Sequence, residues 1–174
     1  MKKIAVLLIM AVLVLPLACV GPTGPVGPPG QDGVNIVGEV FEVNVNFTAA
    51  NEYSEIFDFK PPILPGDMAL AYIRWELQGS TPIWRPLPQV VFLDEGLLQY
   101  NFDFSRNDFR LFLETTFNPS LLDNSWTRNQ RFRILVIPAD LLANARMDFS
   151  DYEAVMKYIG ATEKDFVKLE PKGK

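Results

Sequence analysis

One cysteine stands where this chain most clearly predicts chemistry. Cys19 is the only cysteine, it follows Ala18, and an uncharged apolar run occupies residues 4–14 behind a start that contains two lysines. This is the layout of a secretory signal, and the run is too short for a comfortable membrane span. A cysteine directly after the small residue is typical of a lipid-attachment signal in bacteria, where the thiol receives fatty acyl groups such as palmitate. We therefore predict a signal peptide over residues 1–18 and lipidation of Cys19.

An ordinary signal peptide that is cut elsewhere and leaves a free thiol is the alternative. It stays open because an aliphatic residue usually lies three positions before a lipidated cysteine, where this chain has Pro16. With one cysteine in the chain no internal disulfide can form, so the folded part depends on its core for stability.

A second set of residues suited to binding lies in the segment Trp84-Arg85-Pro86-Leu87-Pro88. Aromatic residues in proline-punctuated loops stack on sugar rings or dock an extended peptide. Trp84, Arg85 and Trp75 are therefore the candidate ligand-binding residues. In the alternative interpretation, Trp84 fills the end of the folded body and Arg85 pairs with a nearby carboxylate.

The residue types exclude most catalytic chemistry. The chain has no histidine and its one cysteine is assigned to the anchor, so Ser–His and Cys–His nucleophiles and the common zinc sites cannot form. A glycosidase-type carboxylate pair would remain, but no pattern places Glu76, Asp94, Glu95 or Glu114 in a common cleft. We predict no catalytic residue, no metal and no cofactor, and hence that the protein is not an enzyme.

Oxygen-bearing side chains near residue 150 have two interpretations. Asp148, Ser150 and Asp151, with Asn144 nearby, could offer ligands to calcium, although their spacing does not match an EF-hand loop. A helix start explains the same residues, because Ser150 followed by Glu153 has capping-box spacing.

That helix is the one helix the sequence predicts. Tyr152, Val155, Met156 and Ile159 form an apolar stripe at helical spacing, and Gly160 would end the helix. The stripe predicts a face that packs on the core rather than a partner site.

The charge balance limits the partners. Without the two lysines of the leader, 14 basic residues stand against 21 acidic ones, a net charge of −7. We therefore expect no nucleic acid as a partner and no attachment to anionic lipid through a basic face. The acyl chains would hold the protein at the membrane, and they anchor it firmly when more than one chain is attached.

Glycine at every third position marks residues 19–33 as a stalk. Gly21, Gly24, Gly27, Gly30 and Gly33 frame four Gly-X-Y triplets, three of them with proline in the second position. Glycine at this period is the requirement of a collagen triple helix. Four triplets are too few to hold three chains together, so a triple helix would need a homotrimeric body; the alternative is a monomeric polyproline spacer.

Alternating apolar and polar residues dominate residues 34–174, the predicted folded domain. The period is that of half-buried strands, and it occurs over residues 37–47, 69–77, 98–104, 109–113 and 132–136. Weaker candidates are 53–59, 88–93 and 165–169, and residues 105–107 predict a turn. We predict a mainly β fold, an antiparallel β-sandwich of jelly-roll or immunoglobulin-like type with one short C-terminal helix, after a collagen-like stalk.

Together these segments resemble a known group of proteins. A lipid cysteine, a few Gly-X-Y triplets, VGEVFEVNVNFTAANEYS, LAYIRWE, WRPLPQ, RFRILVIPAD and DFSDYEAVMKYIG form a layout similar to small uncharacterised collagen-like lipoproteins of Bacteroidota. The resemblance implies acylation of Cys19 and a place on the bacterial outer membrane, and it implies no activity. Surface-displayed lipoproteins of that phylum often have acidic residues after the cysteine. Because Val20-Gly21-Pro22 follows here, we expect the periplasmic side rather than the cell surface.

Two functions from different classes are compatible with this layout. The first is a structural or protein-interaction role in the cell envelope, with an envelope protein as partner. A flat apolar patch on the folded body would favour this function. The second is a glycan- or peptide-binding module that uses exposed aromatic residues around Trp84. An exposed aromatic cleft would favour this function.

Overall fold

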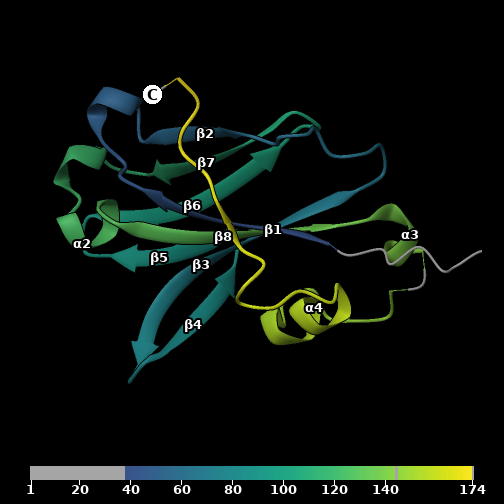
Figure 1. Ribbon diagram of the computed structural model, residues 1–174. Coiled ribbons are helices and arrows are strands. Elements are labelled where there is room, and N and C mark those ends of the chain that lie inside the picture. Colours follow the sequence, from purple (N-terminus) through teal and green to yellow (C-terminus); the bar gives the residue numbers. More distant parts are fainter. Residues whose placement is uncertain (1–37, 144, 174) are drawn as a thin grey trace, which may run out of the picture. The chain divides into compact units, whose positions relative to one another are not determined.

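Strands outnumber helices in the part of the chain that the structure describes. The computed structural model describes residues 38–143 and 145–173 (Figure 1). The predicted signal peptide, Cys19, the Gly-X-Y stalk and Asn144 lie outside these residues. The described chain forms two mainly antiparallel sheets with a few short helices, which confirms the prediction of a mainly β fold.

Sheet A has five strands in the order β4-β3-β8-β1-β9. Their bounds are β1 Glu39–Val45, β3 Met68–Gln78, β4 Thr81–Pro86, β8 Gln130–Ile137 and β9 Val167–Lys168. All neighbours are antiparallel except β1 and β9, which run parallel.

Sheet B has four antiparallel strands in the order β2-β7-β6-β5. Their bounds are β2 Ser54–Asp58, β5 Gln89–Leu93, β6 Gly96–Phe104 and β7 Asp108–Thr115. The predicted turn at residues 105–107 joins β6 to β7, where the Ser105 hydroxyl donates to the Asp108 carboxylate at 2.6 Å.

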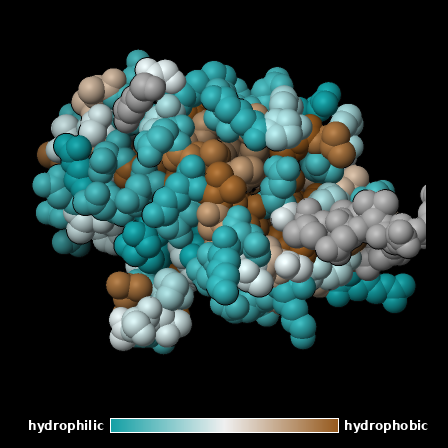
Figure 2. All heavy atoms as spheres, in the orientation of Figure 1, coloured by the Kyte–Doolittle hydropathy of each residue, from teal (hydrophilic) through white to brown (hydrophobic). Residues whose placement is uncertain are grey.

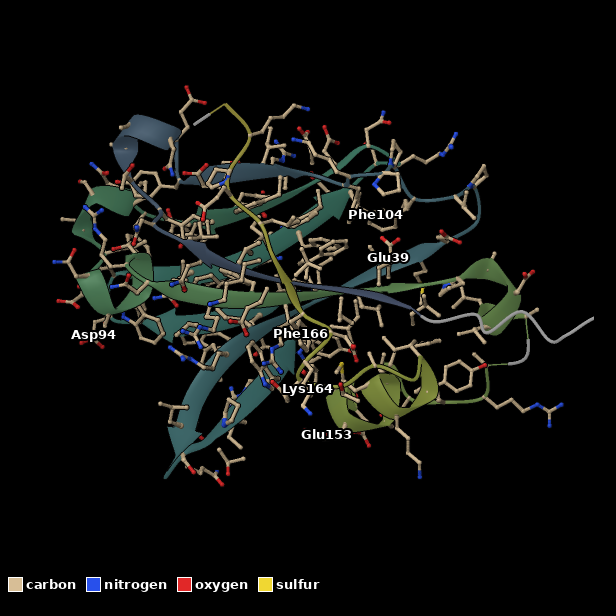
Figure 3. All side chains as sticks on the ribbon, in the orientation of Figure 1. Glu39, Asp94, Phe104, Glu153, Lys164 and Phe166 are labelled. Carbon is tan, nitrogen blue, oxygen red and sulfur yellow. The ribbon has the colours of Figure 1, made fainter. Side chains whose placement is uncertain are left out.

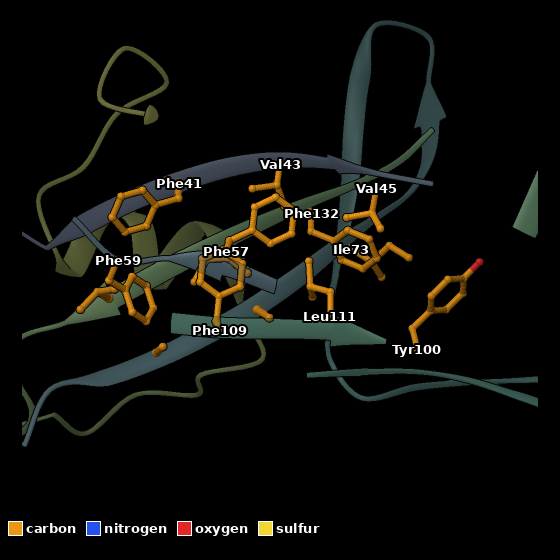
Figure 4. Close-up of a cluster of buried hydrophobic side chains, with 14 of the residues drawn as sticks. Phe41, Val43, Val45, Phe57, Phe59, Ile73, Tyr100, Phe109, Leu111 and Phe132 are labelled. Atoms are coloured by element: carbon orange, nitrogen blue, oxygen red, sulfur yellow. The ribbon is translucent and has the colours of Figure 1, made fainter. Parts of the chain in front are cut away.

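The two sheets share one hydrophobic core (Figure 4). Sheet A contributes Phe41, Val43, Ile73 and Phe132, among others, while sheet B contributes aromatic and aliphatic side chains of β2, β6 and β7. The apolar half of the alternating pattern supplies this core, as expected for strands with one face turned inward.

A second core lies on the outer face of sheet A, where α4 (Tyr152–Tyr158) packs. All four residues of the predicted apolar stripe are buried there, and Gly160 follows the helix with a left-handed φ of 69°, as predicted. Because α4 covers this face, Tyr72 is fully buried, although the alternation alone placed it on the outer side.

The helix start differs from the prediction. Asp151, not Ser150, is the N-cap residue, and its carboxylate accepts from the Ala154 amide at 3.0 Å. The Ser150 amide instead donates to the Asp148 carboxylate at 2.8 Å. The predicted capping box between Ser150 and Glu153 is therefore wrong, because an aspartate one position later satisfies the helix amides.

The remaining helices are short and lie between strands. Their bounds are η1 Ala49–Asn51, η2 Pro119–Leu121, α2 Asn124–Thr127 and α3 Ala139–Leu142. No helix among the described residues has both the length and the apolar character needed to cross a bilayer.

One strand was missed by the sequence pattern. Trp84, Arg85 and Pro86, which belong to β4, were expected in a loop because Pro86 and Pro88 punctuate that segment. In the structure, β4 is an outer strand of sheet A, a position that tolerates proline because one side of the strand needs no hydrogen-bond donors.

The C-terminal segment, residues 161–173, crosses from one sheet to the other (Figure 1). It pairs with β1 of sheet A through β9 and then reaches β2 of sheet B, where the Lys172 amide donates to the Ile56 carbonyl at 2.7 Å. The Lys172 ammonium also lies 2.8 Å from Asp58 and 3.2 Å from Asp108. The segment therefore ties the two sheets together along the side formed by β1 and β2.

Candidate functional site

The antiparallel ladder of β3 and β4 places the candidate ligand-binding residues on two different faces of sheet A. Trp84 is directly opposite Arg74, and Arg85 is opposite Ile73. Opposite residues of a ladder share a face, and successive residues alternate between faces. Trp84 therefore lies on the outer face with α4, whereas Arg85 and Trp75 lie on the side of the shared core.

On the outer face, Trp84 is part of a cluster around Arg133 of β8. The Arg133 guanidinium lies 4.2 Å from the centre of the Trp84 ring and 4.1 Å from that of Phe166, which belongs to the C-terminal segment (Figure 3). Tyr152 stacks on Trp84 with ring centres 5.6 Å apart. Trp84 is half-buried, and these neighbouring side chains pack against its ring.

Arg133 is 5% exposed, and it donates hydrogen bonds to three side chains. It donates to both carboxylate oxygens of Glu163, at 2.7 and 2.6 Å, to Glu42 at 3.1 Å, and to the Tyr152 hydroxyl. Burial opposes the charged form of Arg133, but the hydrogen bond to Glu163 and the contacts with Tyr152 outweigh it, so the pKa is raised above its ordinary value. A buried arginine with this many partners holds its surroundings in place.

On the other face, Trp75 contacts both Arg85 and Trp126 of α2. The Arg85 guanidinium lies 4.3 Å from the centre of the Trp75 ring, and the two indoles are 6.3 Å apart. Beside them is a small pocket of about 130 Å³ lined by Trp75, Trp126 and Tyr100, among others. Pockets that enclose a small molecule have volumes of about 300–1,000 Å³, so this one is too small to enclose a ligand.

A larger groove lies beside the C-terminal segment, where Figure 2 shows hydrophobic atoms near the middle of the face. It has a volume of about 390 Å³, its floor includes Phe41, Val167 and Leu169, and Glu39 and Lys60 lie on its rim. Burial, with a smaller contribution from the charge of Asp67, raises the pKa of the Glu39 carboxyl. No aromatic ring is exposed in it for stacking, since its one aromatic residue, Phe41, is buried.

An exposed apolar patch at the outer strand β5 escaped the sequence analysis. Phe92 is 83% exposed, Val90 is 45% exposed and Leu97 of β6, directly opposite Phe92, is 38% exposed. We call these three residues the β5 patch; they share the outer face of sheet B. Their exposure could not be recognised because Gln89–Leu93 has the composition of a buried strand.

Asp148, Ser150 and Asp151, which were considered for calcium, have structural roles in the fold. Asp151 caps α4 and Asp148 closes the preceding turn, and a hydrogen bond to the Ser150 amide lowers the Asp148 pKa. The described residues contain no group of three or more carboxylate, histidine or cysteine side chains placed to hold a metal. Of the carboxylates weighed as a catalytic pair, Asp94 and Glu95 form the β5–β6 turn, Glu76 lies on β3 of sheet A, and Glu114 on β7 of sheet B accepts from Asn101.

No protein-family model, curated protein or solved structure matches the chain.

Proposed function

We propose that this protein is a lipid-anchored envelope protein with a structural or protein-interaction role and no enzymatic activity. Cys19 would carry the acyl chains on the bacterial outer membrane, facing the periplasm. Residues 19–33 would form the stalk that sets the distance of the body from the membrane. The body would be a β-sandwich of jelly-roll or immunoglobulin-like type, and the layout is that of the collagen-like lipoproteins of Bacteroidota.

The β5 patch is the observation that carries this proposal. A side chain as large as phenylalanine, 83% exposed beside two further exposed apolar residues, is a contiguous apolar surface of the kind that marks protein-interaction sites. The patch lies on the exposed outer face of an edge strand, which suits contact with a protein surface.

A glycan- or peptide-binding module is the second candidate, and the geometry favours it less. Sugar recognition by stacking needs a free aromatic face. Trp84 is covered by Arg133 and Tyr152, and Arg85 lies over the ring of Trp75. The groove beside Val167 could take an extended apolar peptide, which keeps the peptide-binding form of this candidate.

Cross-linking in intact envelopes tests the role of the patch. We expect Phe92→Lys to reduce the yield of cross-linked adducts about fivefold or more, because a charge replaces the most exposed apolar contact. Leu121→Lys is the matched control, since Leu121 is 62% exposed on η2, outside the β5 patch. Equal adduct yields from both variants would remove the proposed interaction surface.

A further inference from the structure

The outer strands of the two sheets differ in how they are protected from pairing with another chain. Of the four, β4 carries Pro82 and Pro86, β9 is two residues long, and β2 receives a hydrogen bond from Lys172 of the C-terminal segment. Proteins commonly block exposed strand edges with such features. Strand β5 has neither a proline nor a charge, and no described residue bonds to its free side.

Backbone hydrogen bonds of β6 show which groups of β5 face that free side. The Leu97 amide donates to the Thr116 hydroxyl at 2.9 Å, and the Leu97 carbonyl accepts from the Thr116 amide at 3.1 Å. Leu97 therefore directs its backbone away from β5, and Phe92, its partner in the ladder, directs its own N–H and C=O toward the free edge. By the two-residue period of a strand, Val90 does the same.

We propose that a second copy of this chain adds to this edge, with β5 antiparallel to β5 about a two-fold axis at Val91. This rests on the proposed function, because it names the partner of the β5 patch. Val90 of one copy would be opposite Phe92 of the other, and each such pair would exchange two backbone hydrogen bonds. The axis is normal to the sheet, so both exposed side chains of each pair lie on the same outer face and pack on each other.

The neighbouring residues select this register. An axis at Val90 would place Phe92 opposite Pro88, which has no N–H to donate. An axis at Phe92 would place Val90 opposite Asp94, a charged residue in the β5–β6 turn (labelled in Figure 3). Only the axis at Val91 pairs both residues that have free backbone groups and brings apolar side chains together.

The expected association is weak in solution. One pair of five-residue strands buries less than the roughly 1,000 Å² that a stable complex needs. A dissociation constant on the order of 100 μM would suffice on a membrane, since tethering raises effective concentrations to about the millimolar range.

Disulfide trapping tests the register in solution. The full chain carries Cys19→Ser, so that the only thiols are introduced ones, and Val90→Cys and Phe92→Cys proteins are oxidised separately and as an equimolar mixture. Hydrogen-bonded partners about 5.5 Å apart at Cα are within disulfide reach. We expect the mixture to form a disulfide between positions 90 and 92 about tenfold faster than Leu121→Cys forms its own dimer by collision.

Two results would overturn the inference. One is a mixed disulfide that forms no faster than the Leu121→Cys background, and the other is a faster self-disulfide of Phe92→Cys, which indicates a different register. Sedimentation gives an independent readout. The Cys19→Ser chain should show a concentration-dependent dimer, whereas the same chain with Phe92→Lys should show only monomer, because the added charge opposes the contact. If trapping fails while Phe92→Lys still reduces envelope adducts, the second copy is wrong and the interaction role stands; if Phe92→Lys changes neither readout, both fail.

Discussion

Arg133 shows how a single residue organises the outer face of sheet A. Its charge lies between Trp84 and Phe166, and its hydrogen bonds reach β1 through Glu42 and the C-terminal segment through Glu163. Removing one member of a buried ionic group leaves the others without their partner, which costs more than the net contribution of the intact group.

We expect Arg133→Met to lower the free energy of unfolding by about 3 kcal/mol, because Glu42 and Tyr152 lose a buried donor. Glu163→Gln should cost less than about 1 kcal/mol, since this side chain is 69% exposed and Arg133 keeps its bond to Glu42. Urea denaturation at neutral pH measures both. Equal losses for the two variants would contradict the central role of Arg133.

Three buried tyrosines predict the response to alkaline pH. Burial is the main cause that raises the pKa of Tyr72, Tyr100 and Tyr152, the last from an ordinary value near 10 to about 12. Above pH 10 the unfolded state loses these phenolic protons while the folded state keeps them. Stability is therefore complete below pH 10 and falls as the pH rises toward 12, by about 1.4 kcal/mol per pH unit for each tyrosine.

Urea denaturation between pH 8 and 11.5 measures this slope, and Tyr100→Phe is the matched variant. It loses a hydrogen bond to the Trp126 carbonyl, at 2.7 Å, which costs about 1 kcal/mol at pH 8. Its stability should then fall less steeply with pH than that of the natural chain. Parallel slopes would show that Tyr100 does not contribute.

At the scale of elements, the sequence showed those strands whose alternate side chains enter the core between the two sheets. The alternation revealed β1, β3, β6, β7 and β8, because each contributes every second side chain to the shared core. Strand β4 was hidden by the prolines at its end, of which Pro86 lies in the strand, a position that an outer strand tolerates. The exposure of the β5 patch arises because no element among the described residues covers it, a tertiary property that a run of five residues does not contain.

The same limit applies to the candidate site. The types of Trp84, Arg85 and Trp75 were sufficient to mark them as unusual, but only the register of β3 and β4 shows that they lie on two faces. The partners of Trp84 come from β8, α4 and the C-terminal segment. Contacts between segments this distant in sequence follow from the packing of α4 on sheet A, which the apolar stripe predicted only in part.

Gly38 allows that packing by its lack of a side chain. A Cβ at this position would lie 2.7 Å from the Val136 carbonyl oxygen on β8 and 2.8 Å from the Ile159 Cβ after α4. We expect Gly38→Ala to cost about 2–3 kcal/mol and to weaken amide protection in α4, because backbone and helix must move apart. Urea denaturation and hydrogen exchange measure the two effects.

Gly160→Ala is the control for this prediction. Gly160 has a left-handed φ of 69° and nothing within 4 Å of an added Cβ, so the change should cost about 1 kcal/mol of backbone strain alone. Amide protection in α4 should persist. If Gly38→Ala lowered the free energy of unfolding no more than Gly160→Ala, the close packing at Gly38 would not limit stability.

At the scale of the whole molecule, the proposed attachment to the membrane would depend on the predicted lipid. The net charge of −7 after removal of the leader gives the body no electrostatic attraction to anionic lipid. A single acyl chain binds a membrane weakly and reversibly, whereas the several chains expected on Cys19 would hold the protein firmly. The proposed position on the membrane would also determine whether copies meet at the concentrations that a weak β5 contact needs.

We therefore expect Cys19→Ser to move the protein from the membrane fraction to the soluble fraction and to abolish incorporation of labelled palmitate, because the only thiol has been removed. Val20→Ser changes the adjacent residue but keeps the thiol, so it should leave both readouts unchanged. Fractionation of cells expressing each full chain, followed by immunoblotting, gives the comparison. Unchanged membrane retention of Cys19→Ser would contradict acyl anchoring. If only Cys19→Ser moves, and with it the cross-linked adducts that need Phe92 decline, then anchoring supplies the local concentration that the interaction requires.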